Sequence, residues 1–152
     1  MEKTFVMVKP DGVDKRLIGE VISRIEKKGL KIAGLKMMQL NEEFVRKHYA
    51  EHVSKPFFPV LLRFTTCGPV VAMVIEGPNA ISNMRHMAGN TYPEKAEPGT
   101  IRNDYALFVT YNIVHCSDSP ESAEREIKLF FNENEIFDYK TSLEKWNAVL
   151  PA

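Results

Sequence analysis

VVAMVI, at residues 70–75, is a continuous run of apolar residues that directly follows the turn residues Gly68 and Pro69. A strand that is covered on both faces has this composition, because polar residues do not alternate with apolar ones along it. The run therefore predicts a strand in the interior of a sheet, and the other elements can be assigned outward from it.

Before this strand, TFVMV at residues 4–8 has the composition of a strand and stops at Lys9, which precedes the turn-forming sequence Pro10-Asp11-Gly12. From Asp14 to Gly29 the apolar residues recur at helical spacing, which predicts an amphipathic helix. KIAGLKMMQL at 31–40 predicts a second strand, Asn41 is placed to cap a helix that runs to about His52, and VLLRFTTC at 60–67 predicts a short helix.

After the strand, Asn79 is placed to cap a helix that runs to about Gly89. Residues 90–104, NTYPEKAEPGTIRND, lack apolar periodicity and predict a long loop, and residues 106–115, ALFVTYNIVH, predict a strand. Asp118-Ser119-Pro120-Glu121 opens a further helix. Its buried stripe is expected to consist of Ala123, Ile127, Phe130 and Phe131.

This order predicts an α+β fold, a ferredoxin-like βαββαβ sandwich in which helices pack on a four-stranded antiparallel sheet. We expect residues 1–152 to form a single domain, with a C-terminal tail from about residue 140 to 152. Trp146 is expected to anchor this tail on the body of the chain or on a neighbouring subunit.

Charge and cysteine content limit the functional classes. The 20 basic and 20 acidic residues cancel, so no overall field would attract nucleic acid or a membrane, and an anionic ligand must be bound by a local cluster. We expect no specific nucleic-acid partner and no membrane association. With two cysteines, Cys67 and Cys116, and no recognisable targeting segment, the sequence predicts a cytoplasmic protein.

His115 is the first candidate for chemistry, because it ends a predicted strand just where a helix begins. Backbone N–H groups and the positive end of a helix dipole lie close to such a position and favour an anion. A histidine side chain is mostly neutral at pH 7, so one ring nitrogen can act as a nucleophile. Glu126, two turns into the helix, is placed to hold the other ring nitrogen.

Three cations stand beside turns or loops and could form a phosphate pocket: Lys9, Arg85 and Arg102. Phe57 in KPFFP is a candidate for stacking on a nucleotide base, whereas Phe58 is better explained as a core residue. Thr91 and Asn112 could donate hydrogen bonds to phosphate or ribose.

Two alternatives compete with phosphoryl transfer. His48-Tyr49-Ala50-Glu51-His52 matches HxxEH, the motif of inverted zinc proteases, but no third ligand is evident. The second alternative is a ferredoxin-like module that binds nucleotide without catalysing a reaction. The sequence contains neither GxGxxG nor GxxxxGK[ST], so phosphate is not bound by a P-loop.

Five motifs, in order, resemble those of the nucleoside diphosphate kinase family: MVKPDG at 7–12, KPFF at 55–58, GPVVAMV at 68–74, PGTIR at 98–102 and NIVHCSDSPESAEREI at 112–127. The resemblance extends from about residue 3 to 139. It implies a ping-pong enzyme in which His115 takes the γ-phosphoryl group of a nucleoside triphosphate, typically ATP, and passes it to a nucleoside diphosphate.

By matched position, the resemblance implies that His115, Glu126 and Lys9 are catalytic. The implied nucleotide contacts are Lys9, Tyr49, Phe57, Arg85, Thr91, Arg102 and Asn112. Mg²⁺ is expected on the β- and γ-phosphates of the nucleotide, with no metal cage made of protein ligands alone.

The resemblance also implies a homo-oligomer, with a hexamer preferred over a tetramer because Pro93 and Pro98 lie in the loop that supports hexamer contacts. The chain departs from the family pattern at two positions. Cys116 stands where a small residue is common and adds an oxidisable thiol next to His115 in the sequence, and Tyr92 replaces a frequent Asn or Asp.

Overall fold

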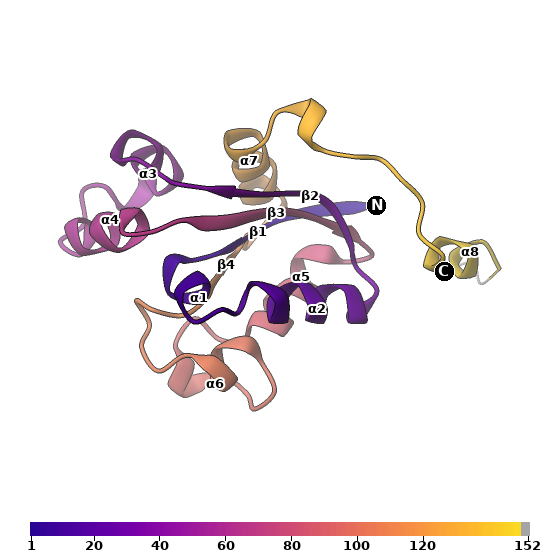
Figure 1. Cartoon of the computed structure of the whole chain (residues 1–152), viewed down its shortest axis with the longest axis horizontal. Helices are drawn as coiled ribbons and strands as arrows, with labels where there is room; N and C mark the ends of the chain where they lie inside the picture. Colours follow the sequence, from indigo (N-terminus) through magenta and orange to yellow (C-terminus); the bar gives the residue numbers. More distant parts are fainter. Residues whose placement is uncertain (150–152) are drawn as a thin grey trace.

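A four-stranded antiparallel sheet with helices on both faces forms the body of the molecule (Figure 1). The structure is a computed structural model and describes residues 1–149. In chain order, its strands and helices, with short 3₁₀ helices written η, are β1 (Glu2–Val8), α1 (Pro10–Asp14), α2 (Ile18–Lys28), β2 (Lys31–Met38), α3 (Glu42–His48), η1 (Ala50–His52), α4 (Phe58–Thr66), β3 (Val70–Gly77), α5 (Ala80–Ala88), η2 (Pro93–Lys95), α6 (Ile101–Tyr105), β4 (Val114–Cys116), α7 (Pro120–Phe130), η3 (Glu133–Glu135) and α8 (Leu143–Val149).

The strand order is β2-β3-β1-β4, and every neighbouring pair is antiparallel. This arrangement confirms the predicted ferredoxin-like fold. The apolar run at 70–75 lies in β3, an interior strand, as its composition predicted. Val6 pairs with Met73 on one side and with Cys116 on the other, so β1 lies between the central strand and the strand that carries His115.

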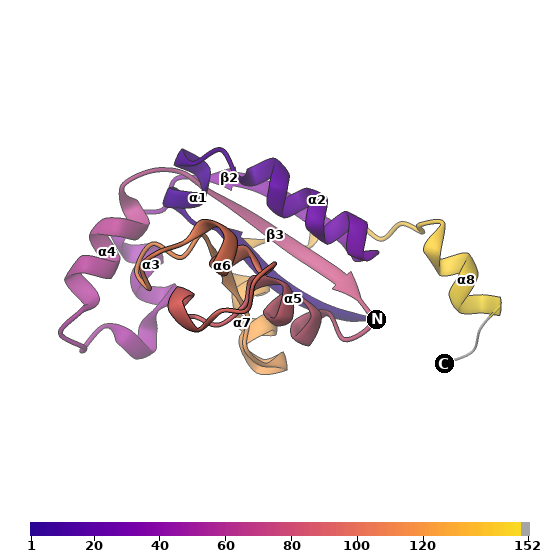
Figure 2. The same ribbon diagram turned by 90° about the horizontal axis from the view of Figure 1, so that it is seen from below.

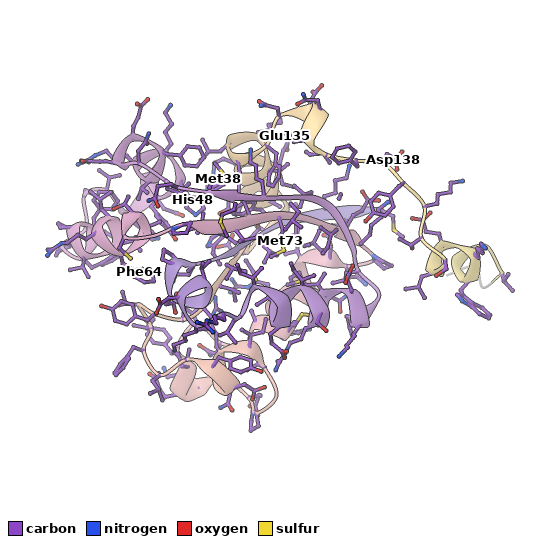
Figure 3. The ribbon with its side chains drawn as sticks, in the orientation of Figure 1. Met38, His48, Phe64, Met73, Glu135 and Asp138 are labelled. Atoms are coloured by element: carbon purple, nitrogen blue, oxygen red, sulfur yellow. The ribbon has the colours of Figure 1, made fainter. Side chains whose placement is uncertain are left out.

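Alternation along the strands divides the core into two layers. Val6, Val8, Met73 and Ile75 belong to the layer covered by α2, α5 and α6, while their neighbours in sequence belong to the layer covered by α3, α4 and α7. Figure 2 shows α2, α5 and α6 on the same side of the sheet, and Figure 3 labels Met73 between the sheet and α2. Burial on both faces explains why β1 and β3 are almost wholly apolar.

Helix α7 forms as predicted and places Glu126 on the face of the sheet that α3 and α4 also cover. The Ser119 hydroxyl accepts a hydrogen bond from the backbone N–H of Ser122 at 3.1 Å, and Pro120 occupies the first turn, where its missing N–H costs nothing. Ala123, Phe130 and Phe131 are buried, and Ile127 is partly buried.

The predicted strand at 106–115 is wrong except at its end, because only Val114–Cys116 pairs with β1. β1 ends at Val8 and Pro10 begins α1, so residues 106–112 have no strand edge to pair with. The large apolar side chains of this stretch are exposed instead, including Leu107 at 80% and Phe108 at 64%, and the only apolar residue buried there is the small Ala106.

Three other local expectations need correction. The helix expected to reach His52 ends at His48 and continues as η1, and the long loop at 90–104 contains η2 and the start of α6, which the Thr100 hydroxyl caps. Asn79 precedes α5, but it has a left-handed backbone conformation and its side chain makes no capping hydrogen bond.

The C-terminal segment runs past β2 to α8, which lies apart from the sheet (Figures 1 and 2). Lys31 contacts Glu144 at 3.5 Å, but Trp146 keeps 63% of its surface exposed, so it does not anchor the tail on the body of this chain. Residues 150–152 of the predicted tail lie outside the described residues. Among residues 1–149, no helix has both the length and the apolar character that crossing a membrane requires.

Candidate active site

One pocket, with a volume of about 460 Å³, opens at the end of β1 and β4. Its size lies in the range of small-molecule sites. All the residues proposed from the sequence line it: Lys9, Tyr49, Phe57, Arg85, Thr91, Arg102, Asn112, His115 and Glu126. They come from four different elements, α5, α6, β4 and α7, and from the connecting segments, so the fold brings together residues that are far apart in the chain.

His115 lies in the middle of β4, opposite Met7 of β1, and its side chain is partly exposed to the pocket. Its Nε2 atom forms a hydrogen bond with Oε2 of Glu126, which comes from α7 and is buried. Since the carboxylate occupies Nε2, the ring nitrogen left to act as a nucleophile is Nδ1. The predicted pairing of these two residues is present in the structure.

Ser117 completes this arrangement and was missed by the sequence reasoning. Its hydroxyl donates a hydrogen bond to Oε1 of Glu126 at 2.7 Å, so both carboxylate oxygens are bound. The available signal was strand alternation, because a residue two positions after His115 points to the same face of the strand.

Lys9 follows β1 directly and is almost wholly buried. Its ammonium group donates hydrogen bonds to Oδ1 of Asn112 at 2.8 Å and to the carbonyl of Thr110 at 3.3 Å. Burial lowers the pKa of Lys9 to about 8, against the opposing influence of Asp11, and nearby Arg102 lowers it further. A lysine so placed is ready to neutralise an incoming phosphate.

A strained backbone joins Lys9 to the strand that carries His115. Ile113 has φ of 72°, in the left-handed region that a β-branched residue rarely adopts. Its N–H donates to Oδ2 of Asp11 at 3.0 Å, and its carbonyl accepts from the N–H of Lys9 at 2.8 Å. Gly12 permits this approach, because a Cβ at that position would lie 2.9 Å from the Ile113 carbonyl oxygen.

Arg102 and Arg85 approach the same strand from the opposite side. Arg102 is buried and donates to the carbonyls of Gly89, Asn112 and Val114, so part of its role is to hold β4 in place. Burial lowers the pKa of its guanidinium group below the usual value. Arg85, on α5, is exposed and its Nη1 lies 3.4 Å from the carbonyl of Cys116.

The other end of the pocket is aromatic and polar. Phe57 is half exposed at the start of α4, with its ring centroid 5.4 Å from that of His52, whereas Phe58 is buried in the core as expected. Asn112 donates through Nδ2 to the carbonyl of Thr91 at 3.0 Å, which ties the loop after α5 to the site. Burial raises the pKa of Tyr49 above its ordinary value, so the phenol keeps its proton.

The HxxEH motif does not form the zinc site that the alternative reading requires. His48 ends α3 and is buried beside His115, while Nδ1 of His52 lies 3.0 Å from Nζ of Lys55. Within residues 1–149, the one cluster of metal-ligating side chains is His48, His115 and Glu126, and it includes neither Glu51 nor His52. A zinc-protease arrangement is therefore absent from the described part of the chain.

Cys116 points to the opposite face of β4 from His115. Strand alternation directs its side chain into the core with Met84, and burial raises its pKa to about 11. The thiol is next to His115 in the sequence, but burial disfavours the thiolate form through which it would be oxidised. Tyr92 lines the pocket and is exposed.

Comparisons with known proteins agree on one family. The family model described as "Nucleoside diphosphate kinase" matches residues 2–136. Proteins named nucleoside diphosphate kinase from Listeria monocytogenes serotype 4b (strain F2365) and Carboxydothermus hydrogenoformans are each 57% identical over 146 residues, or 96% of this chain, and these residues cover 99% and 98% of the two relatives.

Solved structures agree as well. The nucleoside diphosphate kinase of Halobacterium salinarum in complex with CDP superposes with a TM-score of 0.93 at 48% identity, over 95% of this chain and 97% of that one. A nucleoside diphosphate kinase family protein from Babesia bovis superposes with a TM-score of 0.93 at 44% identity, over 96% of this chain and 99% of that one.

Proposed function

This chain belongs to the nucleoside diphosphate kinase family, and we propose that His115 is the residue that carries the phosphoryl group. The chain is a nucleoside-diphosphate kinase, a phosphotransferase, and a module that only binds nucleotide is not favoured. One observation carries the proposal: Glu126 holds Nε2 of His115 in a pocket that Lys9, Arg85 and Arg102 also line.

In the first half-reaction, the lone pair of Nδ1 attacks the γ-phosphorus of a nucleoside triphosphate, typically ATP. The N–P bond forms as the bond to the β,γ-bridging oxygen breaks, and the nucleoside diphosphate leaves with that electron pair. The ring becomes positively charged and keeps its proton on Nε2, where the Glu126 carboxylate stabilises it. A β-phosphate oxygen of a second nucleoside diphosphate then attacks the phosphorus and regenerates His115.

The surrounding residues neutralise and position the phosphates. Lys9, Arg85 and Arg102 supply positive charge, which is the main requirement of phosphoryl transfer. Tyr49, Thr91 and Asn112 line the same pocket and can bind phosphate oxygens or ribose hydroxyls. Phe57 is half exposed at the rim and stacks on the base, an interaction that does not discriminate between bases.

The donor atoms in the pocket fit Mg²⁺ delivered on the nucleotide. Mg²⁺ prefers six oxygen ligands, most of them water and phosphate, whereas the clustered protein ligands here include two imidazoles. Asp118 lines the pocket, and a hydrogen bond from Ser122 lowers the pKa of its carboxyl group, so it is ionised and able to bind the waters of such an ion. The ion would supply charge neutralisation of the β- and γ-phosphates.

We further propose that each chain folds as a single domain and that the protein is a cytoplasmic homo-oligomer. Both thiols are free, which fits a reducing compartment. Two apolar surfaces support self-association: the outer edge strand β2, with exposed Leu35 and Met37, and the segment 107–111, with exposed Leu107 and Phe108. Two different self-associating surfaces on each chain generate dihedral symmetry, which both a tetramer and a hexamer have. We prefer the hexamer, because the family resemblance places Pro93 and Pro98 in the loop that supports hexamer contacts.

A labelling experiment tests the central proposal. After incubation with γ-labelled ATP and denaturation, the wild type should retain label that is stable in alkali and lost in acid, as a phosphoramidate is. GDP added before denaturation should discharge the label as GTP. His115→Ala should remain unlabelled, and His86→Ala, which alters an exposed histidine on α5, should label normally. An unlabelled wild type, or equal labelling of His115→Ala, would show that His115 is not the carrier.

A further inference from the structure

His48 lines the pocket, but phosphoryl transfer gives it no task. Its side chain is buried, with 2% of the residue's surface exposed, and neither Nδ1 nor Nε2 has a hydrogen-bond partner among the described residues. Buried polar groups usually have partners, because leaving one unsatisfied costs about 1–3 kcal/mol. Figure 3 shows His48 at the end of α3, between that helix and the sheet.

The ring of His48 lies directly beside the catalytic pair. It meets the ring of His115 edge-on, with 4.9 Å between the centroids, and its Nδ1 lies 3.6 Å from Oε2 of Glu126. One ligand atom from each of the three side chains can be chosen so that all lie within 4.8 Å of one another. Two imidazoles and a carboxylate thus converge on one point.

We propose that His48, His115 and Glu126 bind a single Zn²⁺ or similar transition-metal ion in the nucleotide-free protein, and that this ion blocks phosphorylation of His115. Two histidines and a glutamate are a known donor set for zinc, which leaves a fourth position for water. Mg²⁺ would not compete for this site, because it prefers oxygen ligands. The site therefore selects an inhibitory ion such as Zn²⁺, which binds imidazole nitrogen, over the Mg²⁺ that accompanies the nucleotide.

A modest rearrangement suffices to form the site. Zinc bonds of 2.0–2.1 Å at tetrahedral angles place neighbouring donor atoms about 3.3 Å apart. Nδ1 of His48 and Oε2 of Glu126, at 3.6 Å, are near this separation already. His115 must give up its direct hydrogen bond to Glu126 and turn within the pocket, which its partial exposure allows. Glu126 then serves the ion and no longer orients His115 for attack.

The binding test uses nucleotide-free protein in Mg²⁺-containing buffer, titrated with Zn²⁺ by calorimetry. We expect one ion per chain. His48→Phe and the smaller His48→Gln should each weaken binding about tenfold or more, since even the loss of a residue that only supports a ligand costs 10- to 100-fold. His52→Gln and His86→Gln are the controls and should bind zinc as the wild type does, and thermal melting checks that each variant folds.

A second measurement needs no variant. Cu²⁺ bound at one equivalent to the wild type should give an electron paramagnetic resonance spectrum with coupling to two imidazole nitrogens. No binding, coupling to fewer than two nitrogens, binding unaffected by both His48 variants, or binding that depends on His52 would overturn the proposal.

The inhibition, unlike the binding, rests on the proposed role of His115. Zinc added before labelled ATP should reduce the phosphoenzyme of the wild type, and the ratio of label with and without zinc should return toward one in His48→Gln. If zinc binds as expected but leaves labelling unchanged, the blocking claim is wrong. If the zinc-free wild type does not label, the role of His115 fails while the metal site stands.

Discussion

Glu126 of α7 shares its two carboxylate oxygens between His115, in β4, and Ser117, which directly follows β4. A buried carboxylate with both oxygens bound has one orientation, and it fixes the imidazole in turn. Lys9 differs from Glu126, because no carboxylate within residues 1–149 contacts its ammonium group directly. Burial therefore destabilises the charged form of Lys9 and lowers its pKa, and a bound phosphate would stabilise that charge. At the scale of single residues, His115 is therefore oriented by partners that do not themselves touch the phosphoryl group, and Lys9 supplies charge to the phosphates directly.

We predict that Glu126→Gln lowers kcat by about 10- to 100-fold with little change in KM, because the amide has the same shape but no charge to stabilise the phosphorylated ring. Rapid-quench measurement of phosphoenzyme formation gives the rate of the affected step. Ser117→Ala is the matched variant, which leaves the charge in place and should reduce the rate less than Glu126→Gln does. A larger loss in Ser117→Ala would contradict the positioning role assigned to Glu126.

We predict that kcat/KM for ATP falls as the pH rises through about 8, because Lys9 then loses the positive charge that binds phosphate. Below this pH Lys9 is mostly charged, so its titration should cause no further change in kcat/KM. The pKa of Cys116 is raised to about 11 and that of Tyr49 is also raised, so neither accounts for a fall near 8. A profile that stays level well beyond pH 8 would contradict this assignment.

Helix α1 and strand β4 form the most constrained contact between elements in the site. α1 begins immediately after Lys9. Within it, the Asp11 carboxylate accepts a hydrogen bond from the N–H of Ile113, whose backbone is strained, and Gly12 leaves room for the Ile113 carbonyl group. Strain of this kind costs about 1–3 kcal/mol and persists only where neighbours impose it. Here the imposed conformation brings Asn112 to Lys9 and lets the chain enter β4 at Val114.

We predict that Gly12→Ala destabilises the protein by roughly 1–3 kcal/mol and lowers activity, because the added Cβ would lie 2.7 Å from Cγ1 of Val8 and 2.9 Å from the Ile113 carbonyl. Denaturant unfolding measures the first effect and a coupled kinase assay the second. Gly19→Ala in α2 is the control, since a Cβ there meets no atom within 4 Å and should stabilise the helix by up to about 1 kcal/mol. Equal effects of the two substitutions would contradict the close contact at Gly12.

At the scale of the whole molecule, two of the places where the described chain exposes apolar side chains bear on its assembly. The outer strand β2 presents Leu35 and Met37, and the segment that failed to form a strand presents Leu107 and Phe108. An exposed edge strand can pair with its own copy about a two-fold axis, because antiparallel pairing of identical strands is self-complementary. The second surface would then close a three-fold contact in the proposed hexamer.

We predict that each surface controls a different step of assembly. Phe108→Glu should leave dimers held by β2, whereas Met37→Glu should leave trimers held by the segment 107–111, because a buried unpaired charge disrupts its own interface. Sedimentation velocity distinguishes these products. Dimers from both variants would indicate a tetramer, and a monomeric wild type would refute the oligomer.

The sequence by itself determined the order of the four strands and of the main helices between them, the interior position of the 70–75 strand and nine of the residues that line the pocket. These follow from local patterns and from motifs, which act over a few residues. The tertiary structure alone decided that residues 106–112 find no strand partner, that Ser117 binds Glu126, and that His48 joins His115 and Glu126. Lys9 and Asn112 are 103 positions apart and meet at 2.8 Å. Such contacts depend on how the whole chain packs around its sheet, and no local pattern encodes them.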